Sequence, residues 1–596
     1  EWLDMSVHGR QVFLARHPGA AARYFDCVIT NFIEIILKYS PCPTDPGVFG
    51  LCNGYYAMVE AQGRGTLHCH MLVWIIGNPS PQALRDSIAG DPAFKTSVFA
   101  WLESIIKCEL PGMTEPRVEN TPDDANKPKW PAGWVNPQYS RGPDIDSLGR
   151  DEFDDAFQKT VTDLAIECNW HEHRATCWKH LKPGQPRNDT SCRMRIDGTT
   201  RGHTSIDEET QSIMLRRLHP RINNYNEVVL FLLRCNIDIK YIGSGEAAKA
   251  LVFYITDYIT KSTLPAHVGL AAVEYAIKKN EEKFAGLEQP THPTALDHAV
   301  GTVVDQDKSL FTKTVMAIMS RQELSHQQVM SYLVGGGDTY HSHTFSTIRW
   351  GDFDRHVATW EQRDKAPPES GQMDYMLVRV DELGISIASD VADYRFRPAE
   401  EEFDLLSMWE HSEWVIKISK ASEEKRLNGN TSADVNVAGP TTKRKRGKRA
   451  NSRGQLLSSH PSAKTHLARL RSTPVVPVLL GSPLPRPDRG EAELEKWCRS
   501  MLVLFKPWRH ASDLLGEHRT WKEAFHACDF SPAVTAVMKN LNVENECQDA
   551  RDEHDKLRRA GKGTSLLAGA LLEFEKVDAD SLHTALVNDP LLDVDD

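Results

Sequence analysis

Apolar residues follow helical spacing near the start of the chain and then give way to strand-like runs. Over 23–40 they recur every three or four residues, which predicts a helix. The stretches 55–62 and 66–76 are rich in β-branched and aromatic residues and predict two strands. Residues 63–65 read Gly-Arg-Gly, which predicts a hairpin with a three-residue loop.

The pattern after the hairpin is mostly helical. A polar, Pro-rich stretch over 111–150 is expected on the surface. The other predicted elements are a strand over 237–242, helices over 246–260, 310–319 and 327–333, and a helical region over 491–541.

With 596 residues, the chain is too long for one hydrophobic core and predicts several domains. No apolar run approaches eighteen residues, so we expect no membrane partner. A polar, basic segment with few aromatic residues is expected to be a disordered linker. The expected divisions are a first domain over 1–265 with a Cys/His insertion over 155–200, a helical extension over 266–417, the linker over 418–473 and a helical region over 474–596.

The net charge of −12 argues against a protein that coats nucleic acid through charge alone. Local basic patches can still serve a nucleic-acid enzyme. Twelve cysteines in this length are too few for a disulfide scaffold, so we expect a reducing compartment with some thiols bound to metal.

His68 and His70 lie one residue apart in the second predicted strand, so their side chains share one face. Two such imidazoles can hold a divalent metal with a third ligand from elsewhere. If 63–65 form the loop, Gln62 pairs with Thr66 and Glu60 lies across from His68. Glu60 is then the expected third ligand, and Gln62 stays open because another loop length changes the face. An isolated His-x-His pair is often structural, and that interpretation also stays open.

Tyr254 and Tyr258 lie at i and i+4 of a predicted helix, on one face. An aromatic pair packed into a core explains such spacing. The alternative is a pair of nucleophiles that attack a DNA phosphodiester beside a metal. Lys261, three residues beyond Tyr258, could hold the phosphate.

A cluster of cysteines and histidines occupies residues 168–192. A four-coordinate structural zinc is expected there, although the spacing fits no standard finger and scattered buried residues remain the alternative. Cys177 and Cys192 are the expected thiolates, completed by two of Cys168, His171, His173 and His180.

The segment Val59-Glu60-Ala61-Gln62-Gly63-Arg64-Gly65-Thr66-Leu67-His68-Cys69-His70 resembles the His-hydrophobic-His (HUH) motif of Helitron rolling-circle transposons, with Cys69 at the hydrophobic position. The segment 254–261 resembles the two-tyrosine motif of the same family, and the Cys/His segment is similar to its zinc-binding insertion. Phe505-Lys506-Pro507-Trp508-Arg509 and 521–525 resemble the connector before the helicase in fungal members.

This resemblance implies an α+β fold: an antiparallel, ferredoxin-like sheet that carries the His-x-His strand, with helices packed on it and a separate helical C-terminal region. It also implies Mg²⁺ or Mn²⁺ at His68, His70 and Glu60 or Gln62. Tyr254 or Tyr258 would cut single-stranded DNA at transposon ends and form a 5′-phosphotyrosine.

Two departures from the family pattern qualify these expectations. The family's first strand motif is not found after Glu1, so we expect the initiator domain to lack a strand here. No G-x-x-x-x-G-K-[ST] string occurs, so we expect no ATP site and no Pif1-like helicase in this chain; a separate helicase would be its partner. A decayed, non-enzymatic DNA-binding remnant is therefore the main alternative. A zinc-dependent DNA-binding regulator and an unrelated metal hydrolase are further ones.

A short basic run lies in the expected linker. A solvated charge run, a nuclear localisation signal and an auxiliary phosphate contact all fit it, and a transposase must reach the nucleus. Its members are Lys443, Arg444, Lys445, Arg446, Lys448 and Arg449.

Overall fold

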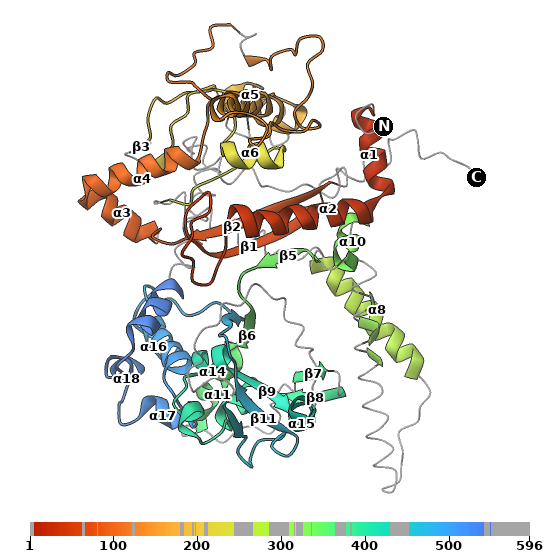
Figure 1. The fold of residues 1–596 in the computed structure, drawn as a ribbon. Coiled ribbons are helices and arrows are strands. Elements are labelled where there is room, and N and C mark those ends of the chain that lie inside the picture. The colour runs from red at the N-terminus through yellow and green to blue at the C-terminus, as the bar shows by residue number, and fades with distance from the viewer. Residues whose placement is uncertain are drawn as a thin grey trace. The chain divides into compact units, whose positions relative to one another are not determined.

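The computed structural model describes most of the chain in two compact units (Figure 1). The described residues are 5–61, 66–79, 81–121, 125–178, 184–192, 198–207, 213–243, 266–284, 326–334, 336–363, 377–381, 384–428 and 452–541, with short pieces between them. Unit 1 contains the described residues through Ser342, and unit 2 contains those from His343 through Leu541. The boundary thus falls later than the expected one at residue 265.

Unit 1 contains a three-stranded antiparallel sheet in the order β2-β1-β5. The strands are β1 (Cys52–Ala61), β2 (Leu67–Ile75) and β5 (Thr339–His341). Strands β1 and β2 are the predicted hairpin, and Glu60 pairs with His68 as the loop arithmetic predicts. The loop residues 62–65 lie outside the described residues.

Two helices cover one face of this sheet. Ala57 and Val59 of β1 point to that face and are fully buried. Tyr340, the ladder partner of Ala57, donates a hydrogen bond to Asp26 Oδ1 in α2 at 2.7 Å. Helix α2 (Pro18–Asn31) also packs against α10 (His326–Val334), and α2 continues into the π-helical turn Phe32–Ile36, so the helix predicted over 23–40 is confirmed. Since ladder partners share a face, Glu60, His68 and His70 lie on the opposite face of the sheet.

A second part of unit 1 is built on α5 (Arg150–Asn169) and α6 (Glu227–Leu233), which pack together. Val161, Leu164 and Ala165 of α5 are buried against Ile222, Tyr225 and Leu230. Asn226 caps α6 by accepting a hydrogen bond from Val229 N, and Asp91 caps α4 in the same way. The other elements of unit 1 are α1 (Val7–Arg16), α3 (Pro81–Gly90), α4 (Pro92–Ile105), η3 (Ala175–Trp178), η4 (Asp189–Ser191), β3 (Ser205–Ile206), β4 (Ile213–Met214) and α8 (Ala266–Phe284).

Unit 2 has its own core around α16 (Glu491–Phe505). Met501, Leu502 and Leu504 of this helix are fully buried, as is Trp508 just after it. The strands are β6 (Phe345–Arg349), β7 (Leu377–Asp381), β8 (Gly384–Ala388), β9 (Val415–Ser419), β10 (Arg453–Gln455), β11 (His466–Leu470) and β12 (Val476–Leu480). The other helices are α11 (Trp350–Arg363), α12 (Asp390–Arg395), α13 (Glu401–Asp404), α14 (Met408–Trp414), α15 (Lys420–Asn428), α17 (Ala511–Leu515) and α18 (Trp521–His526).

The expected disordered linker over 418–473 is wrong at both ends. Strands β9, β11 and β10 form an antiparallel sheet in the order β10-β11-β9. Leu467, Ala468 and Leu470 of β11 are buried in its core. Residues 429–451 and their basic run lie outside the described residues.

The strand predicted over 237–242 is also wrong. Its backbone pairs with none of the described strands, because side-chain amides form hydrogen bonds with its N–H and C=O groups instead. Asn169 exchanges two hydrogen bonds with the backbone of Ile237, at 2.9 and 3.2 Å. Asn224 Nδ2 donates to Ile239 O at 3.0 Å. The segment therefore runs as an extended loop beside α5.

Mixed helices and antiparallel sheets agree with the predicted α+β class. The ferredoxin-like arrangement stays a prediction. No helix among the described residues has the length and apolar character needed to cross a bilayer.

Candidate functional site

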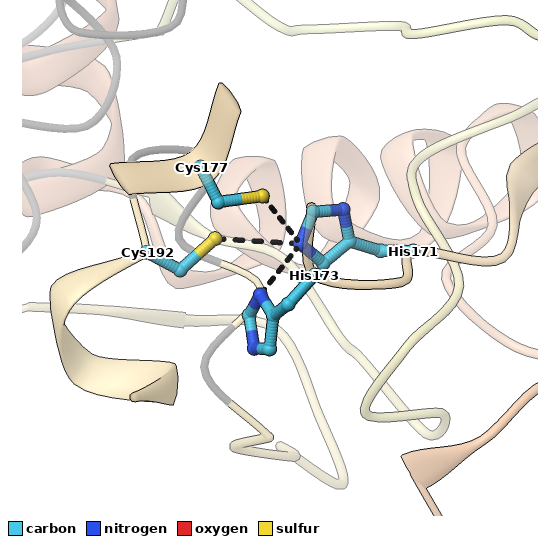
Figure 2. A group of neighbouring side chains, drawn as sticks. All are labelled: His171, His173, Cys177 and Cys192. Atoms are coloured by element: carbon cyan, nitrogen blue, oxygen red, sulfur yellow. Dashed lines mark hydrogen bonds between the residues drawn. The ribbon is translucent and has the colours of Figure 1, made fainter. Parts of the chain in front are cut away.

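Four of the predicted zinc ligands converge in the segment after α5. His171 Nε2 lies 3.2 Å from His173 Nδ1, 3.8 Å from Cys177 Sγ and 3.3 Å from Cys192 Sγ. All four ligand atoms lie within 4.8 Å of one another. Figure 2 shows the two thiols and the two rings facing one another. The group could therefore hold a metal ion.

The spacing of these atoms fits a tetrahedral ion. With Zn–N near 2.05 Å and Zn–S near 2.3 Å, a tetrahedron separates two nitrogens by about 3.3 Å and nitrogen from sulfur by about 3.6 Å. The distances from His171 Nε2 to its three neighbours are 3.2, 3.3 and 3.8 Å. Two nitrogens and two sulfurs form a donor set typical of structural zinc.

Short helical turns position the two cysteines of this group, and the surrounding structure buries them. Cys177 lies in the 3-10 turn η3, and Cys192 directly follows the turn η4, which Asn188 caps. Both thiols are buried. Burial, followed by the positive charges of nearby residues, lowers the pKa of His171 to about 4. The ring is neutral at pH 7 and can bind a metal without first losing a proton.

Cys168 is a correction to the predicted ligand set. It lies in the last turn of α5, and its Sγ is 4.0 Å from the carbonyl oxygen of Arg234. That contact turns it toward α6 and away from the four ligands, and it is not among the residues that converge. His180 lies outside the described residues.

Sequence reasoning missed two residues beside the group. His173 Nε2 lies 2.6 Å from Asp189 Oδ1, and Asp189 in turn pairs with the buried Arg221. The Arg221 hydrogen bond is the main cause that lowers the pKa of Asp189. Asp189 could have been noticed as the only carboxylate between Cys177 and Cys192. The sequence position of Arg221 carries no such signal.

The His-x-His strand forms the second candidate site. In the ladder Glu60 pairs with His68, and Met58 pairs with His70. The two imidazole rings lie 4.6 Å apart, edge to face. Burial lowers the pKa of His68, against an opposing effect of the Asp238 carboxylate, and burial with the neighbouring His68 lowers the pKa of His70 to about 4. Both rings are therefore neutral at pH 7, the form that binds metals.

The extended loop 237–243 lies beside this strand. Tyr241 donates a hydrogen bond to Asn78 Oδ1, just after β2, at 2.6 Å, and its ring packs edge-on against Trp101 at 5.8 Å. The Asp238 carboxylate is close enough to act on His68. Sequence reasoning also missed Asp238, because its approach depends on this long-range packing.

The other predicted site residues lie outside the described residues. They are Gln62, Tyr254, Tyr258, Lys261, Lys443, Arg444, Lys445, Arg446, Lys448 and Arg449.

Comparison with known families relates the start of the chain to transposon proteins. Residues 4–73 match the family model described as the Helitron helicase-like domain at the N-terminus. This segment includes α2, β1 and both histidines of the His-x-His strand, and it ends before the His/Cys group. No curated protein and no solved structure matches the chain. This match supports a relation of the chain to Helitron proteins over residues 4–73, and the fungal type and the details of the HUH motif stay predictions.

Proposed function

We propose that the chain is a Helitron-type transposon protein that nicks and transfers single-stranded DNA through a tyrosine nucleophile. One observation carries this proposal: Glu60 lies opposite His68 in the β1–β2 ladder, with His70 next on the same face. The Helitron match over residues 4–73 covers these same residues.

The three side chains suit a hard divalent cation. Two neutral imidazoles and a carboxylate are ligands that Mn²⁺ accepts well and Mg²⁺ acceptably. The pKa of each histidine is lowered by burial, so protons do not compete for the ring nitrogens at pH 7. We propose that His68, His70 and Glu60 hold this ion; Gln62 is the alternative oxygen donor.

A bound cation would neutralise charge on the non-bridging oxygens of the scissile phosphate. The phenol oxygen of Tyr254 or Tyr258 forms the new bond to phosphorus, and the bond from phosphorus to the 3′ oxygen breaks. The phenol proton is lost and the departing oxygen gains one, which leaves a 5′-phosphotyrosine and a free 3′-hydroxyl. The second tyrosine serves a second cleavage during strand transfer, and Lys261 holds the phosphate.

The loop 237–243 supports the placement of this chemistry. It precedes the tyrosine segment by eleven residues, counted from Gly243 to Tyr254. The hydrogen bond from Tyr241 to Asn78 holds it next to the end of β2. Eleven residues can span about 35 Å when extended, so the tyrosines can reach the face that bears His68 and His70.

We propose zinc as the ion of the His171, His173, Cys177 and Cys192 group, in a structural role. The donor set, its near-tetrahedral spacing and its burial support this choice. Four protein ligands leave no open position for a substrate, so the group would stabilise the α5–α6 part of unit 1.

We also propose that the protein acts in the nucleus, on single-stranded DNA at transposon ends. The basic run Lys443–Arg449 would direct nuclear entry or contact phosphates. Unwinding of the donor DNA would fall to a separate helicase.

A covalent-adduct assay tests the nicking proposal. Wild type, Tyr254→Phe, Tyr258→Phe and the double variant are incubated with Mn²⁺ and single-stranded oligonucleotides labelled at either end, then resolved on a denaturing gel. We expect a Mn²⁺-dependent adduct on the 5′ end of the cleaved product that the double variant abolishes. Tyr275→Phe, which changes an exposed tyrosine of α8, is the control and should match wild type.

No adduct from folded, metal-loaded protein would contradict the proposal. It would favour the alternative of a DNA-binding remnant without catalysis. Binding of the same oligonucleotides that zinc removal abolishes, with both tyrosines irrelevant, would favour a zinc-dependent DNA-binding protein.

A further inference from the structure

The two ring nitrogens of His173 lie in different surroundings. Nδ1 faces the other ligands and lies 3.2 Å from His171 Nε2. Nε2 points away from them, to Asp189 Oδ1 at 2.6 Å. Figure 2 shows the same orientation, with one nitrogen of the His173 ring directed at His171.

A carboxylate can only accept a hydrogen bond, so this contact requires the proton of the neutral His173 ring on Nε2. The lone pair of Nδ1 is then free to face the two thiols and His171. His171 has the reverse arrangement, because its Nε2 is the atom that lies within 3.8 Å of both cysteine sulfurs.

Asp189 is itself held in place by Arg221. Arg221 Nη1 and Nη2 donate to the two carboxylate oxygens of Asp189 at 3.1 and 2.8 Å. The same guanidinium donates to Glu119 at 2.8 and 2.5 Å, and Arg221 is only 3% exposed. Its carbonyl oxygen also accepts a hydrogen bond from His171 N at 2.8 Å. Arg221 therefore contacts both the ligand loop and the carboxylate that orients His173.

We infer that Asp189 is the positioning residue of this metal centre and that the centre uses unlike histidine nitrogens, Nδ1 of His173 and Nε2 of His171. This inference rests on the zinc occupancy proposed above. Carboxylates that hold a ligating histidine fix its tautomer and orientation and make the ring a better donor. The hydrogen bonds from Arg221 would hold the Asp189 carboxylate in position before the metal ion binds.

The test uses the full chain loaded with Zn²⁺, with Asp189→Asn and the control Glu172→Gln. Glu172 lies between His171 and His173, and its side chain is exposed. Zinc affinity is measured by competition with a chromophoric chelator. We expect Asp189→Asn to weaken zinc binding by about 10- to 100-fold, the usual cost of losing such a partner, and Glu172→Gln to stay within about twofold of wild type.

A second readout separates orientation from general stability. Long-range ¹H–¹⁵N spectra of histidine-labelled, zinc-loaded wild type give the state of each ring nitrogen, and loss of a signal in His173→Gln assigns it. We expect His173 with a protonated Nε2 and a metal-bound Nδ1. If Asp189→Asn does not fold, the spectrum of the wild type alone tests which nitrogen of His173 binds the metal.

Two results would overturn the inference while leaving the zinc centre intact. These are unchanged zinc affinity in Asp189→Asn, and binding of the ion through Nε2 of His173. Failure of wild type to bind zinc at all would instead overturn the proposed occupancy, and the inference with it. The nicking proposal is unaffected by any of these outcomes.

Discussion

Glu60 lies directly opposite His68 in the antiparallel ladder of β1 and β2. We expect Glu60→Ala to lower the rate of Mn²⁺-dependent adduct formation by roughly 100-fold or more, because a charged ligand is lost at the ion itself. The measurement is the adduct rate as a function of Mn²⁺ concentration. Glu34→Ala, which changes an exposed carboxylate of the same unit, should match wild type. An unchanged Mn²⁺ dependence in Glu60→Ala would exclude it as a ligand.

The separation of Cys168 from the four converging residues gives a direct test of the proposed zinc ligands. Bound zinc is measured by mass spectrometry of the purified, dialysed chain. We expect about one zinc per chain in wild type and Cys168→Ser, and strong loss in Cys177→Ser and Cys192→Ser, since a four-ligand site loses a quarter of its donors. Equal loss in Cys168→Ser would show that the ligand set is wrong.

Burial, followed by the positive charges of Arg117, Arg217 and Arg221, lowers the pKa of His219 to about 3. In the unfolded chain the His219 ring binds a proton near pH 6.5, whereas in the folded chain it stays neutral until the pH is much lower. The free energy of unfolding therefore decreases as the pH falls from about 6.5 toward 3. One such group changes the free energy of unfolding by about 1.4 kcal/mol per pH unit in this window.

His219→Gln should therefore reduce the pH dependence of the urea midpoint by the contribution of one titrating group. Its ring nitrogen Nδ1 accepts a hydrogen bond from Arg221 N at 3.1 Å, and the glutamine oxygen can take over that role. The measurement compares wild type and variant between pH 4.5 and 7. Equal slopes for the two proteins would refute the pKa shift of His219.

Arg397 is 1% exposed and binds four backbone carbonyls of unit 2. Its guanidinium donates to Phe403 O, Tyr394 O, Trp508 O and Asp404 O at 2.9, 2.9, 2.8 and 2.7 Å. Arg397→Met removes the guanidinium donor from all four oxygens inside a buried site, so we expect a loss of about 3 kcal/mol or more in stability. Chemical unfolding followed by tryptophan fluorescence measures it. Arg489→Met, at an exposed position, should change stability by less than about 0.5 kcal/mol, and a similar effect of both variants would count against the role of Arg397.

The basic run predicts nuclear entry. The full chain fused to a fluorescent protein should accumulate in the nucleus, and replacing Lys443, Arg444, Lys445 and Arg446 with alanine should abolish this. Replacing Arg486 and Arg489 instead is the control for a loss of positive charge. Nuclear accumulation that survives the first change would assign the run to a linker or to DNA contact.

The local features of both sites could be predicted from sequence. A three-residue loop fixes which residues of a hairpin face each other, so the pairing of Glu60 with His68 followed from counting. Four of the predicted zinc ligands lie within residues 171–192, and residues of such a short segment remain close in space when the chain folds. Cys168 looked equivalent because it is only three residues from His171, but it belongs to the last turn of α5 and faces Arg234.

The contacts made over long sequence distances could not be predicted. Arg221 reaches Glu119 across 102 residues and Asp189 across 32, and only the assembled fold sets these partners. The strand predicted over 237–242 failed because Asn169 and Asn224 take up its backbone groups. The linker prediction failed because β11 buries Leu467 and Leu470 within a polar, charged stretch whose composition hides them.

The order β2-β1-β5 has a consequence for synthesis on the ribosome. Strand β1 ends at Ala61, and its second neighbour β5 begins only at Thr339. At 5 to 20 residues per second, roughly 15 to 55 s pass between the emergence of the two strands. During that time one edge of β1 has no partner strand of its own, although the hairpin and the α5 region can already fold. The nascent protein therefore exposes a strand edge from the completion of β1 until Thr339 has been made, and this is the stage at which a chaperone would protect it from aggregation.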